Sequence, residues 1–272
     1  KSQTETAYFV SVDIDKPSCL EIELNSEFKN YEIRPLEFNL ECVRTANKIS
    51  VNIDKPMQFT FEPNDFHEAL HVFVNSGQER PYLSDGNVIY YGPGEHTAGI
   101  IWVKSGQTVY IDEGAVVHGM IYAKDASDFK ILGRGILDSS RYHRANDPRN
   151  DGTVADTLRK NGVCENFAET GPIYSNMVLY NCKNAVVEGI VLRDAMFWSV
   201  IIRNGCENIT LDNIKIIGQW RYNSDGIDVC ASKNIIVKNS FIRSFDDCFV
   251  VRGPYLPDET QNVENVAIEN CV

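Results

Sequence analysis

The chain has 272 residues, of which 43% are hydrophobic, and 38 acidic against 26 basic residues give it a formal net charge of −12. This length and apolar content allow one large domain or two smaller ones. The acidic balance argues against nucleic acid or an anionic membrane surface as a partner. The sequence contains no run of about 18 apolar residues, so it predicts no membrane span.

The first four residues, Lys-Ser-Gln-Thr, are polar and lack the apolar core of a signal peptide. Either the protein is cytosolic or a signal peptide has already been removed, and composition leaves both explanations open. We favour the second explanation and expect a secreted, periplasmic or cell-surface protein.

Residues 1–86 contain short β-like runs, several of which alternate apolar and polar side chains, as at 7–12, 19–24 and 57–61. Such alternation is typical of half-buried antiparallel strands. Proline, asparagine and aspartate residues punctuate the runs. We therefore predict an N-terminal β-sandwich domain over residues 1–86, with a linker at 81–87.

From residue 87 onward the β-like runs recur at a regular interval. Four of them begin with an asparagine, at positions 184, 208, 234 and 265. These asparagines are 24, 26 and 31 positions apart, and a period in this range indicates a repeat architecture. Each repeat holds about three short strands and no helix-length amphipathic stretch. The physical solution is a coil of parallel strands that stack about 4.8 Å apart. We predict an all-β chain in which residues 87–272 form a right-handed parallel β-helix, the catalytic domain.

The repeated asparagines have a structural interpretation. A turn between strands of a coil needs a residue that tolerates the left-handed helical conformation, and asparagine tolerates it. Stacked asparagine side chains can also donate hydrogen bonds from one repeat to the next. We expect these residues to stabilise the coil.

The chain contains eight cysteines, and none forms a Cys-x-x-Cys pair, so neither a zinc site nor a redox motif is indicated. Cys182, Cys206 and Cys230 keep a constant spacing and fit free thiols in the core. A disulfide between Cys19 and Cys42 is an alternative that the sequence does not decide.

Residues 141–172 interrupt the repeat with a polar and irregular stretch. We expect a long loop that bulges from the coil. Long loops on repeat scaffolds often line a binding face, although a solvated excursion explains the composition equally well.

Two segments concentrate carboxylates: 223–228 reads Asn-Ser-Asp-Gly-Ile-Asp, and 244–248 reads Ser-Phe-Asp-Asp-Cys. Asp225 and Asp246 are separated by a little under one repeat, so they fall on neighbouring levels of one face. Carboxylates that converge repel one another, which raises some pKa values and leaves others low. Glycoside hydrolysis needs that division between a protonated acid and an ionised base. The candidate catalytic residues are Asp225, Asp246 and Asp247.

Two other interpretations fit an Asp-Asp pair. One is a turn or a solvated edge, and the other is a calcium site, because clustered carboxylates suit hard cations. The spacing on a repeat scaffold favours the catalytic interpretation, and we expect neither a metal nor a cofactor.

The two segments resemble glycoside hydrolase family 28, the polygalacturonases, whose pattern is Asn-Thr-Asp followed by Gly/Gln-Asp-Asp at about this separation. Here serine replaces threonine and phenylalanine precedes the pair. The resemblance implies an inverting hydrolase in which Asp246 is the general acid, whereas Asp225 and Asp247 hold and activate the water. Asn223 and Asp228 would support the sugar or the aspartates.

Two further residues complete the candidate substrate-binding set. Tyr222 adjoins the first motif, where an aromatic ring either stacks on a sugar face or fills a core. Arg252 follows the aspartate pair, and it either contacts a carboxylate or hydroxyl of the substrate or forms a salt bridge with a site aspartate.

Segments 88–96 and 109–119 also resemble glycoside hydrolase family 49, the dextranases, which combine an N-terminal β-sandwich with a β-helix and three aspartates. The expected partner is therefore a polysaccharide or oligosaccharide, either galacturonan or a neutral glucan such as dextran. A non-catalytic carbohydrate-binding β-helix and a calcium-dependent β-helical lyase are alternatives from other classes.

Polygalacturonases carry a Gly-His-Gly and an Arg-x-Lys after the aspartate pair, whereas no histidine follows Asp247 in the printed sequence. We therefore expect a further C-terminal segment that completes the β-helix and its site.

Overall fold

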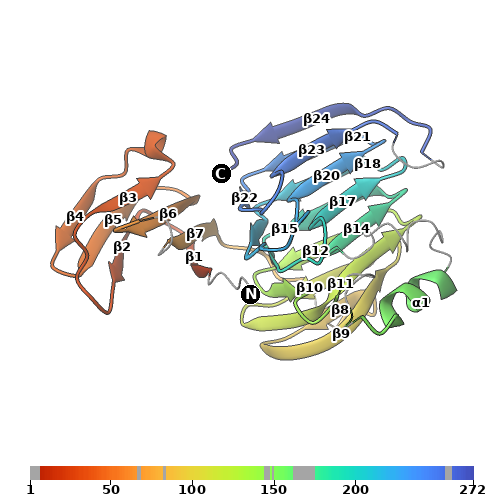
Figure 1. Ribbon diagram of the computed structural model, residues 1–272, viewed down its shortest axis with the longest axis horizontal. Helices are drawn as coiled ribbons and strands as arrows, with labels where there is room; N and C mark the ends of the chain where they lie inside the picture. Colours follow the sequence, from red (N-terminus) through yellow and green to blue (C-terminus); the bar gives the residue numbers. More distant parts are fainter. Residues whose placement is uncertain are drawn as a thin grey trace. The chain divides into compact units, whose positions relative to one another are not determined.

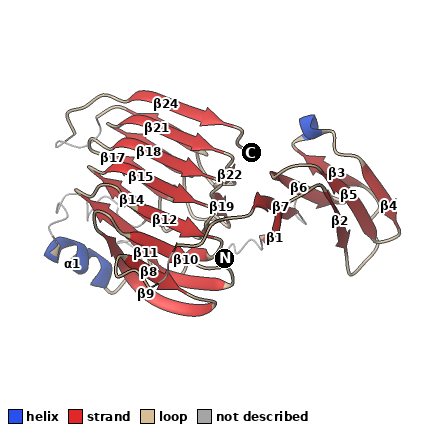
Figure 2. Cartoon of the chain, turned by 180° about the vertical axis from the view of Figure 1, so that it is seen from behind, coloured by secondary structure: helices blue, strands red, loops and turns tan. Residues whose placement is uncertain are grey.

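The computed structural model describes residues 7–65, 69–81, 84–143, 148, 150–161, 175–254 and 259–272. The chain folds into two compact units, which meet in sequence between Glu79 and Arg80. The predicted domain boundary, between residues 86 and 87, lies slightly further along the chain. Strands dominate both units (Figure 2), and the helical segments of the described part are α1 (Thr153–Lys160) and the short 3-10 turn η1 (Leu36–Phe38). The prediction of an all-β chain is confirmed.

The first unit contains two sheets. Its described strands are β1 (Tyr8–Ile14), β2 (Ser18–Glu23), β3 (Tyr31–Arg34), β4 (Cys42–Thr45), β5 (Lys48–Ile53), β6 (Met57–Pro63) and β7 (Leu70–Ser76). One sheet has the order β1-β7-β6-β3, and the other has the order β2-β5-β4. Both sheets contribute side chains to one hydrophobic cluster, for example Ile22 and Ile49 from one sheet and Phe59 and Phe61 from the other. The N-terminal β-sandwich stays a prediction.

The second unit is a stack of short strands (Figure 1). The described strands are β8 (Val88–Tyr91), β9 (Gly94–Val103), β10 (Thr108–Ile111), β11 (Ala115–Lys124), β12 (Lys130–Gly133), β13 (Ile136–Asp138), β14 (Met177–Tyr180), β15 (Lys183–Glu188), β16 (Val191–Arg193), β17 (Val200–Arg203), β18 (Glu207–Asp212), β19 (Lys215–Ile217), β20 (Ile227–Cys230), β21 (Lys233–Lys238), β22 (Phe241–Ile242), β23 (Phe249–Arg252) and β24 (Glu264–Glu269).

These strands form a coil, and each of its turns is called a rung below. One sheet has the order β8-β10-β12-β15-β18-β21-β24. The other has two arms, β13-β16-β19-β22 and β14-β17-β20-β23, which the long strand β11 joins, and β9 pairs with β11. Each described pairing in the unit is parallel. The predicted repeats are therefore rungs of one parallel coil, whose hand stays a prediction.

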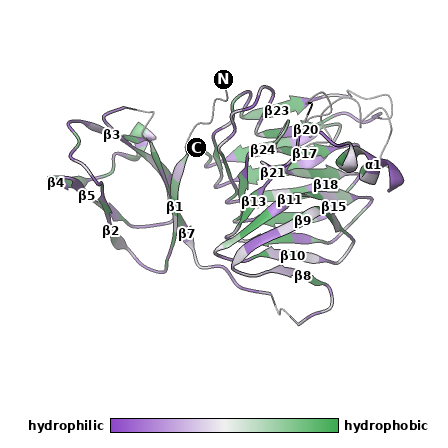
Figure 3. Ribbon diagram, turned by 60° about the horizontal axis from the view of Figure 1, so that its bottom comes forward, coloured by the Kyte–Doolittle hydropathy of each residue, from purple (hydrophilic) through white to green (hydrophobic). Residues whose placement is uncertain are grey.

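The core of the coil comes from alternate side chains of each strand, because successive residues of a strand point to opposite faces. On neighbouring rungs Val187, Leu211 and Val237 occupy one inward column and are fully buried. Figure 3 shows hydrophobic stretches along the stacked strands. This continuous apolar interior explains why the unit stacks without helices inside it.

The repeated asparagines form a hydrogen-bonded column at one corner of the coil. The Nδ2 of Asn208 donates to Asn184 Oδ1 at 3.0 Å, and Asn234 and Asn265 continue the pattern at 3.0 and 3.1 Å. At the other end of the column Asn184 donates to Asp128 Oδ1. All four asparagines have φ between 52° and 58°. Both structural roles predicted for these asparagines are confirmed.

The polar stretch 141–172 contains the helix α1, which the sequence interpretation missed. Val154 and Leu158, four residues apart, place two apolar side chains on one face of α1. They pack in a second hydrophobic cluster with Met120, Val178 and Ile201, on the strand face opposite the core. Eight residues with two apolar contacts give a weak periodic signal, so composition alone suggested an irregular loop. Residues 162–174 lie outside the described part.

The cysteines that the structure describes are free thiols. Cys19 and Cys42 are not joined, so the alternative of a disulfide between them is not realised. Cys182, Cys206 and Cys230 are buried, as expected for core thiols. No helix in the described part of the chain is long and apolar enough to cross a membrane.

Candidate active site

The candidate catalytic residues lie at one corner of the coil, between the two arms of the larger sheet. Because strands of each arm pair in register, the segments that connect the arms stack on successive rungs. Four stretches of these connections, at 139–143, 194–199, 218–226 and 243–248, lie in the described part of the chain. We call these segments the acidic corner.

Asp225 precedes β20, and Asp246 and Asp247 precede β23 on the next rung. The backbone N–H of Gly226 donates to the carbonyl oxygen of Asp247 at 2.8 Å, and that of Ile227 donates to Cys248 O at 3.1 Å. The structure therefore brings the three aspartates to adjacent levels of one corner, as their spacing predicts.

Gly226 makes this close approach of backbones possible. A Cβ atom at this position would lie 2.3 Å from the carbonyl oxygen of Cys248 and 2.5 Å from Ile242 Cγ2. Contacts of that length do not occur for real side chains, and the nearer atom is backbone that cannot rotate away. A residue without a side chain next to Asp225 is thus a packing requirement of the corner.

The residues before Asp225 connect it to the neighbouring rung. Asn223 adopts a left-handed conformation with φ 55°, and its Nδ2 lies 3.5 Å from Asp246 Oδ2. Ser224 is fully buried, and its carbonyl oxygen accepts a hydrogen bond from the backbone N–H of Phe245 at 3.3 Å. Asn223 is therefore in reach of the aspartate pair, and its role in supporting the sugar or the aspartates stays a prediction.

The aspartates differ in burial, and this difference separates their chemistry. Asp225 is only 4% exposed, and its Oδ1 has no hydrogen-bond partner among the described residues. Burial, followed by the charges of Asp246 and Asp247, raises the pKa of Asp225 to about 6. Asp246 and Asp247 are exposed. The corner therefore presents two accessible carboxyls beside a buried one whose pKa lies above the ordinary value for aspartate.

Asp228 lies below the surface on β20 and has no exposed area. Neither of its carboxyl oxygens has a hydrogen-bond partner in the described part of the chain. Burial, followed by the charge of Asp225, raises its pKa to about 8. Such a group can support the aspartates from beneath, whereas its predicted contact with a sugar stays a prediction.

Tyr222 and Arg252 flank the aspartates in different environments. The ring of Tyr222 is 70% exposed, so it is not part of a core. The guanidinium carbon of Arg252 lies 5.0 Å from the ring centroid of Trp198. The positive charge of Arg252 also lowers the pKa values of Asp225 and Asp228, against the larger effect of burial. Arg252 therefore interacts electrostatically with the candidate site.

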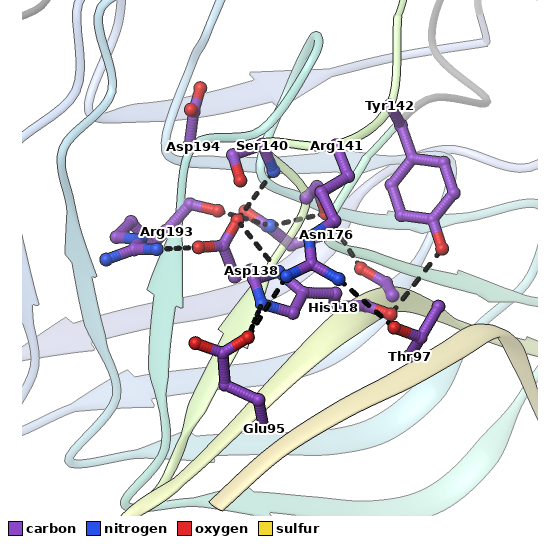
Figure 4. Close-up of polar contacts among 12 residues, drawn as sticks. Glu95, Thr97, His118, Asp138, Ser140, Arg141, Tyr142, Asn176, Arg193 and Asp194 are labelled. Atoms are coloured by element: carbon purple, nitrogen blue, oxygen red, sulfur yellow. Dashed lines mark hydrogen bonds and ion pairs between the residues drawn. The ribbon is translucent and has the colours of Figure 1, made fainter.

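A second polar cluster, which sequence reasoning did not find, lies on earlier rungs of the same corner (Figure 4). The register aligns Thr97, His118, Asp138 and Arg193 in one column across four strands. Arg193 forms an ion pair with the fully buried Asp138. Thr97, His118 and Asp138 lie 21 and 20 positions apart, but Arg193 follows only after a further 55, so spacing along the chain does not reveal the whole column.

His118 is nearly buried in this cluster. Its Nε2 lies 3.6 Å from Glu95 Oε2, and its Nδ1 lies 4.0 Å from Asp138 Oδ1. Burial, followed by the charge of Arg141, lowers the pKa of His118. Arg141 in turn pairs with Glu95 at 3.1 Å. The acids and bases of this cluster thus neutralise one another in pairs.

Among the described residues no group of three or more histidine, cysteine, aspartate or glutamate side chains is arranged to hold a metal ion.

Known proteins resemble the chain most clearly around this site. Residues 151–271 match the family model for glycosyl hydrolases family 28. An exopolygalacturonase of Cochliobolus carbonum is 30% identical over 99 residues, which are 35% of this chain and 20% of that protein. A probable polygalacturonase of Arabidopsis thaliana is 27% identical over 114 residues, 34% of this chain and 25% of that protein. The alignments span a quarter or less of these relatives.

Solved structures extend the resemblance to the fold of the chain. Dex49A from Penicillium minioluteum superimposes with a TM-score of 0.62 at 12% identity, over 96% of this chain and 59% of that one. A family 28 exopolygalacturonase of Yersinia enterocolitica gives a TM-score of 0.52 at 14% identity, over 94% and 67%. The second unit has the parallel β-helix fold of these structures. The chain is similar to glycoside hydrolases, and its resemblance to family 28, predicted from Asn223 and the aspartates, is confirmed over residues 151–271.

Proposed function

We propose that this protein hydrolyses O-glycosidic bonds of a polysaccharide by an inverting acid/base mechanism, and that its substrate is polygalacturonan-like. The observation that supports this most is the meeting of Asp225 with Asp246 and Asp247 on adjacent rungs, where the Gly226 amide lies 2.8 Å from Asp247 O. Inverting hydrolysis uses one carboxylic acid for the leaving oxygen and a carboxylate for water.

The proposed roles follow the resemblance to family 28. Asp246, which is exposed, gives its proton to the leaving glycosidic oxygen. Asp225 and Asp247 hold and activate the attacking water. A carboxyl with a pKa of about 6 is ionised above that pH and is then a stronger proton acceptor than an ordinary aspartate. Asp225 therefore suits the role of base near neutral pH.

The choice of galacturonan rests on the relatives, whose names include polygalacturonases. A dextranase-like activity on a neutral glucan is the second candidate, because the acidic chain and the paired charges of the corner offer no excess of positive charge to uronates. Asn223, Tyr222 and Arg252 are the proposed substrate contacts. We further propose a secreted, periplasmic or cell-surface location and an N-terminal β-sandwich.

The test is a polysaccharide panel that includes polygalacturonate and dextran, with reducing ends measured for the full-length protein. On the substrate that responds, Asp246→Asn should lower the rate roughly 100- to 10,000-fold, because a general acid contributes about that much. Asp156→Asn, in an exposed pair on α1, is the matched control and should keep full activity.

The anomeric form of the first product, followed by NMR, tests the stereochemistry. Inversion supports the proposal, whereas a product of retained configuration contradicts it. Full activity of Asp246→Asn would show that the acid is another residue. Binding of a polysaccharide without any release of reducing ends would favour a non-catalytic carbohydrate-binding protein.

A further inference from the structure

Arg221 joins three successive levels of the acidic corner. Its Nε lies 3.1 Å from Asp194 Oδ1, on the segment that follows β16. Its Nη1 and Nη2 donate to the carbonyl oxygens of Tyr142 and Ser140 at 3.0 and 3.2 Å, on the segment that follows β13. One guanidinium therefore ties the segment 218–226 to both preceding connections.

The backbone of Arg221 continues this link toward the aspartates. Its carbonyl oxygen accepts hydrogen bonds from the backbone N–H of Ser224 at 3.0 Å and from Ser224 Oγ at 2.5 Å. Ser224 is fully buried and immediately precedes Asp225. The position of the Asp225 backbone thus depends on a short, hydrogen-bonded path that begins at the Arg221 side chain.

The chemistry of these contacts requires a guanidinium. Arg221 and Asp194 are both shielded from water, with side chains 13% and 15% exposed. A planar guanidinium can donate to two carbonyl oxygens with its Nη groups while its charge pairs with a carboxylate, whereas an ammonium is a point charge on a flexible stem. Lysine at this position would keep the ion pair and lose part of the fixed geometry.

Arg141 provides a comparison in the same corner. Its guanidinium pairs with Glu95 and donates to Thr97 Oγ1, both on β9, and its side chain is 49% exposed. These contacts connect earlier rungs and do not involve segment 218–226. An arginine of the acidic corner therefore does not contact segment 218–226 merely because it lies in that corner.

We propose that Arg221 is a positioning residue, which holds segment 218–226 so that the carboxyl of Asp225 meets those of Asp246 and Asp247 in the arrangement that hydrolysis requires. This inference rests on the proposed function. It assigns Arg221 no contact with substrate. Its role is to fix the segment, because misplacement of a catalytic group by about 1 Å can lower a rate roughly 100-fold.

The kinetic test compares Arg221→Met, Arg221→Lys and the control Arg141→Met in the full-length protein. Arg221→Met should lower kcat about 10- to 100-fold and leave KM within about twofold, because substrate contacts remain. Arg221→Lys should recover part of the loss, and Arg141→Met should match the wild type. Thermal unfolding shows whether each variant folds. If Arg221→Met does not fold, the kcat of Arg221→Lys is compared with that of the wild type instead.

A second measurement needs no activity. Amide hydrogen exchange of residues 218–226, without substrate, should be faster in Arg221→Met than in the wild type and unchanged in Arg141→Met. A folded Arg221→Met with wild-type kcat, or with equal exchange in this segment, overturns the inference. A wild-type protein that hydrolyses no polysaccharide defeats the proposed function instead, and the exchange data still decide whether Arg221 anchors the segment.

Discussion

Two corners of the same coil follow opposite rules. At the asparagine corner, short connections join β14 to β15, β17 to β18 and β20 to β21, and identical amides stack from rung to rung. At the acidic corner the connections are unequal: β13 and β14 are separated by 139–176, but β22 and β23 only by 243–248. The first corner repeats one residue, whereas the second changes its residues at every level.

The difference follows from hydrogen-bonding chemistry. An asparagine amide donates to one neighbour and accepts from the other, so a column of them satisfies itself indefinitely. A carboxylate only accepts, so stacked aspartates repel one another or take up protons. Asp225 and Asp228 have raised pKa values, chiefly because they are buried and to a smaller extent because of neighbouring aspartate charges, and both have carboxyl oxygens that lack partners among the described residues. One corner therefore contributes stability, and the other holds groups suited to proton transfer.

The largest expected effect on activity comes from adding a methyl group at Gly226, where two rungs of the acidic corner touch. Gly226→Ala places a Cβ against the carbonyl oxygen of Cys248, so the rungs that carry the aspartates must separate. We expect a loss of about 3 kcal/mol in the free energy of unfolding, since overpacked cores lose up to roughly this amount, together with loss of hydrolysis. Denaturant unfolding and the reducing-end assay measure both.

Gly253→Ala is the matched control, because among the described residues no atom beyond its chain neighbours lies within 4 Å of its added Cβ. It should keep both stability and activity. Wild-type behaviour of Gly226→Ala would show that the two rungs adjust freely and that their close approach is not needed.

The buried carboxyl of Asp228 should make stability depend on pH. Its pKa of about 8 in the folded protein lies above the unfolded value. The folded state therefore keeps a proton that the unfolded state releases above about pH 4. The contribution of Asp228 to the free energy of unfolding is fully present below about pH 4 and is lost as pH rises toward and through 8.

Asp228→Asn removes this dependence. We expect the variant to equal the wild type near pH 4 and to exceed it by roughly 5 kcal/mol at pH 8, because the shift spans about four pKa units. Urea unfolding at the two pH values measures the difference. A stability gap that is larger at pH 4 than at pH 8 would contradict the assignment.

The activity should fall on the acid side because Asp225 must be ionised to accept a proton from water. With a pKa of about 6, each further unit of acidity should lower kcat/KM about tenfold. A profile of kcat/KM between pH 4 and 8 tests this limb, and Asp156→Asn should reproduce it. A rate that rises between pH 6 and pH 5 would rule out an ionised Asp225 as the base.

The smallest effect is expected at the asparagine corner. Asn208→Gly keeps the left-handed backbone but loses the bonds to Asn184 and Asn234, which should cost about 1 kcal/mol. Asn208→Ala should cost roughly 1 kcal/mol more, because alanine resists a positive φ. Both variants should hydrolyse substrate at the wild-type rate, and loss of activity without loss of stability would break the contrast between the corners.

Several parts of the site could be predicted from sequence because they lie in the repeat. The spacing of Asp225 and Asp246 placed them on neighbouring rungs, and the motif around Asn223 supplied the resemblance to family 28. The helix α1 and the contacts of Arg221 could not be predicted. They depend on segments of unequal length, which carry no period, and on pairs such as Arg221 and Asp194 that only stacking brings together.

The sequence by itself determined the periodic part of this protein: the all-β class, the parallel rungs, the asparagine column and the grouping of three aspartates. The rungs and the asparagine column recur every 24 to 31 positions, the aspartates are separated by a little under one rung, and hydrophobic alternation and residue spacing report these features directly. Only the tertiary structure decided how deeply each carboxyl is buried. Asp225 and Asp228 lie beneath the surface whereas Asp246 and Asp247 are exposed, and burial, which depends on all the surrounding rungs, is the main cause of the raised pKa values of Asp225 and Asp228.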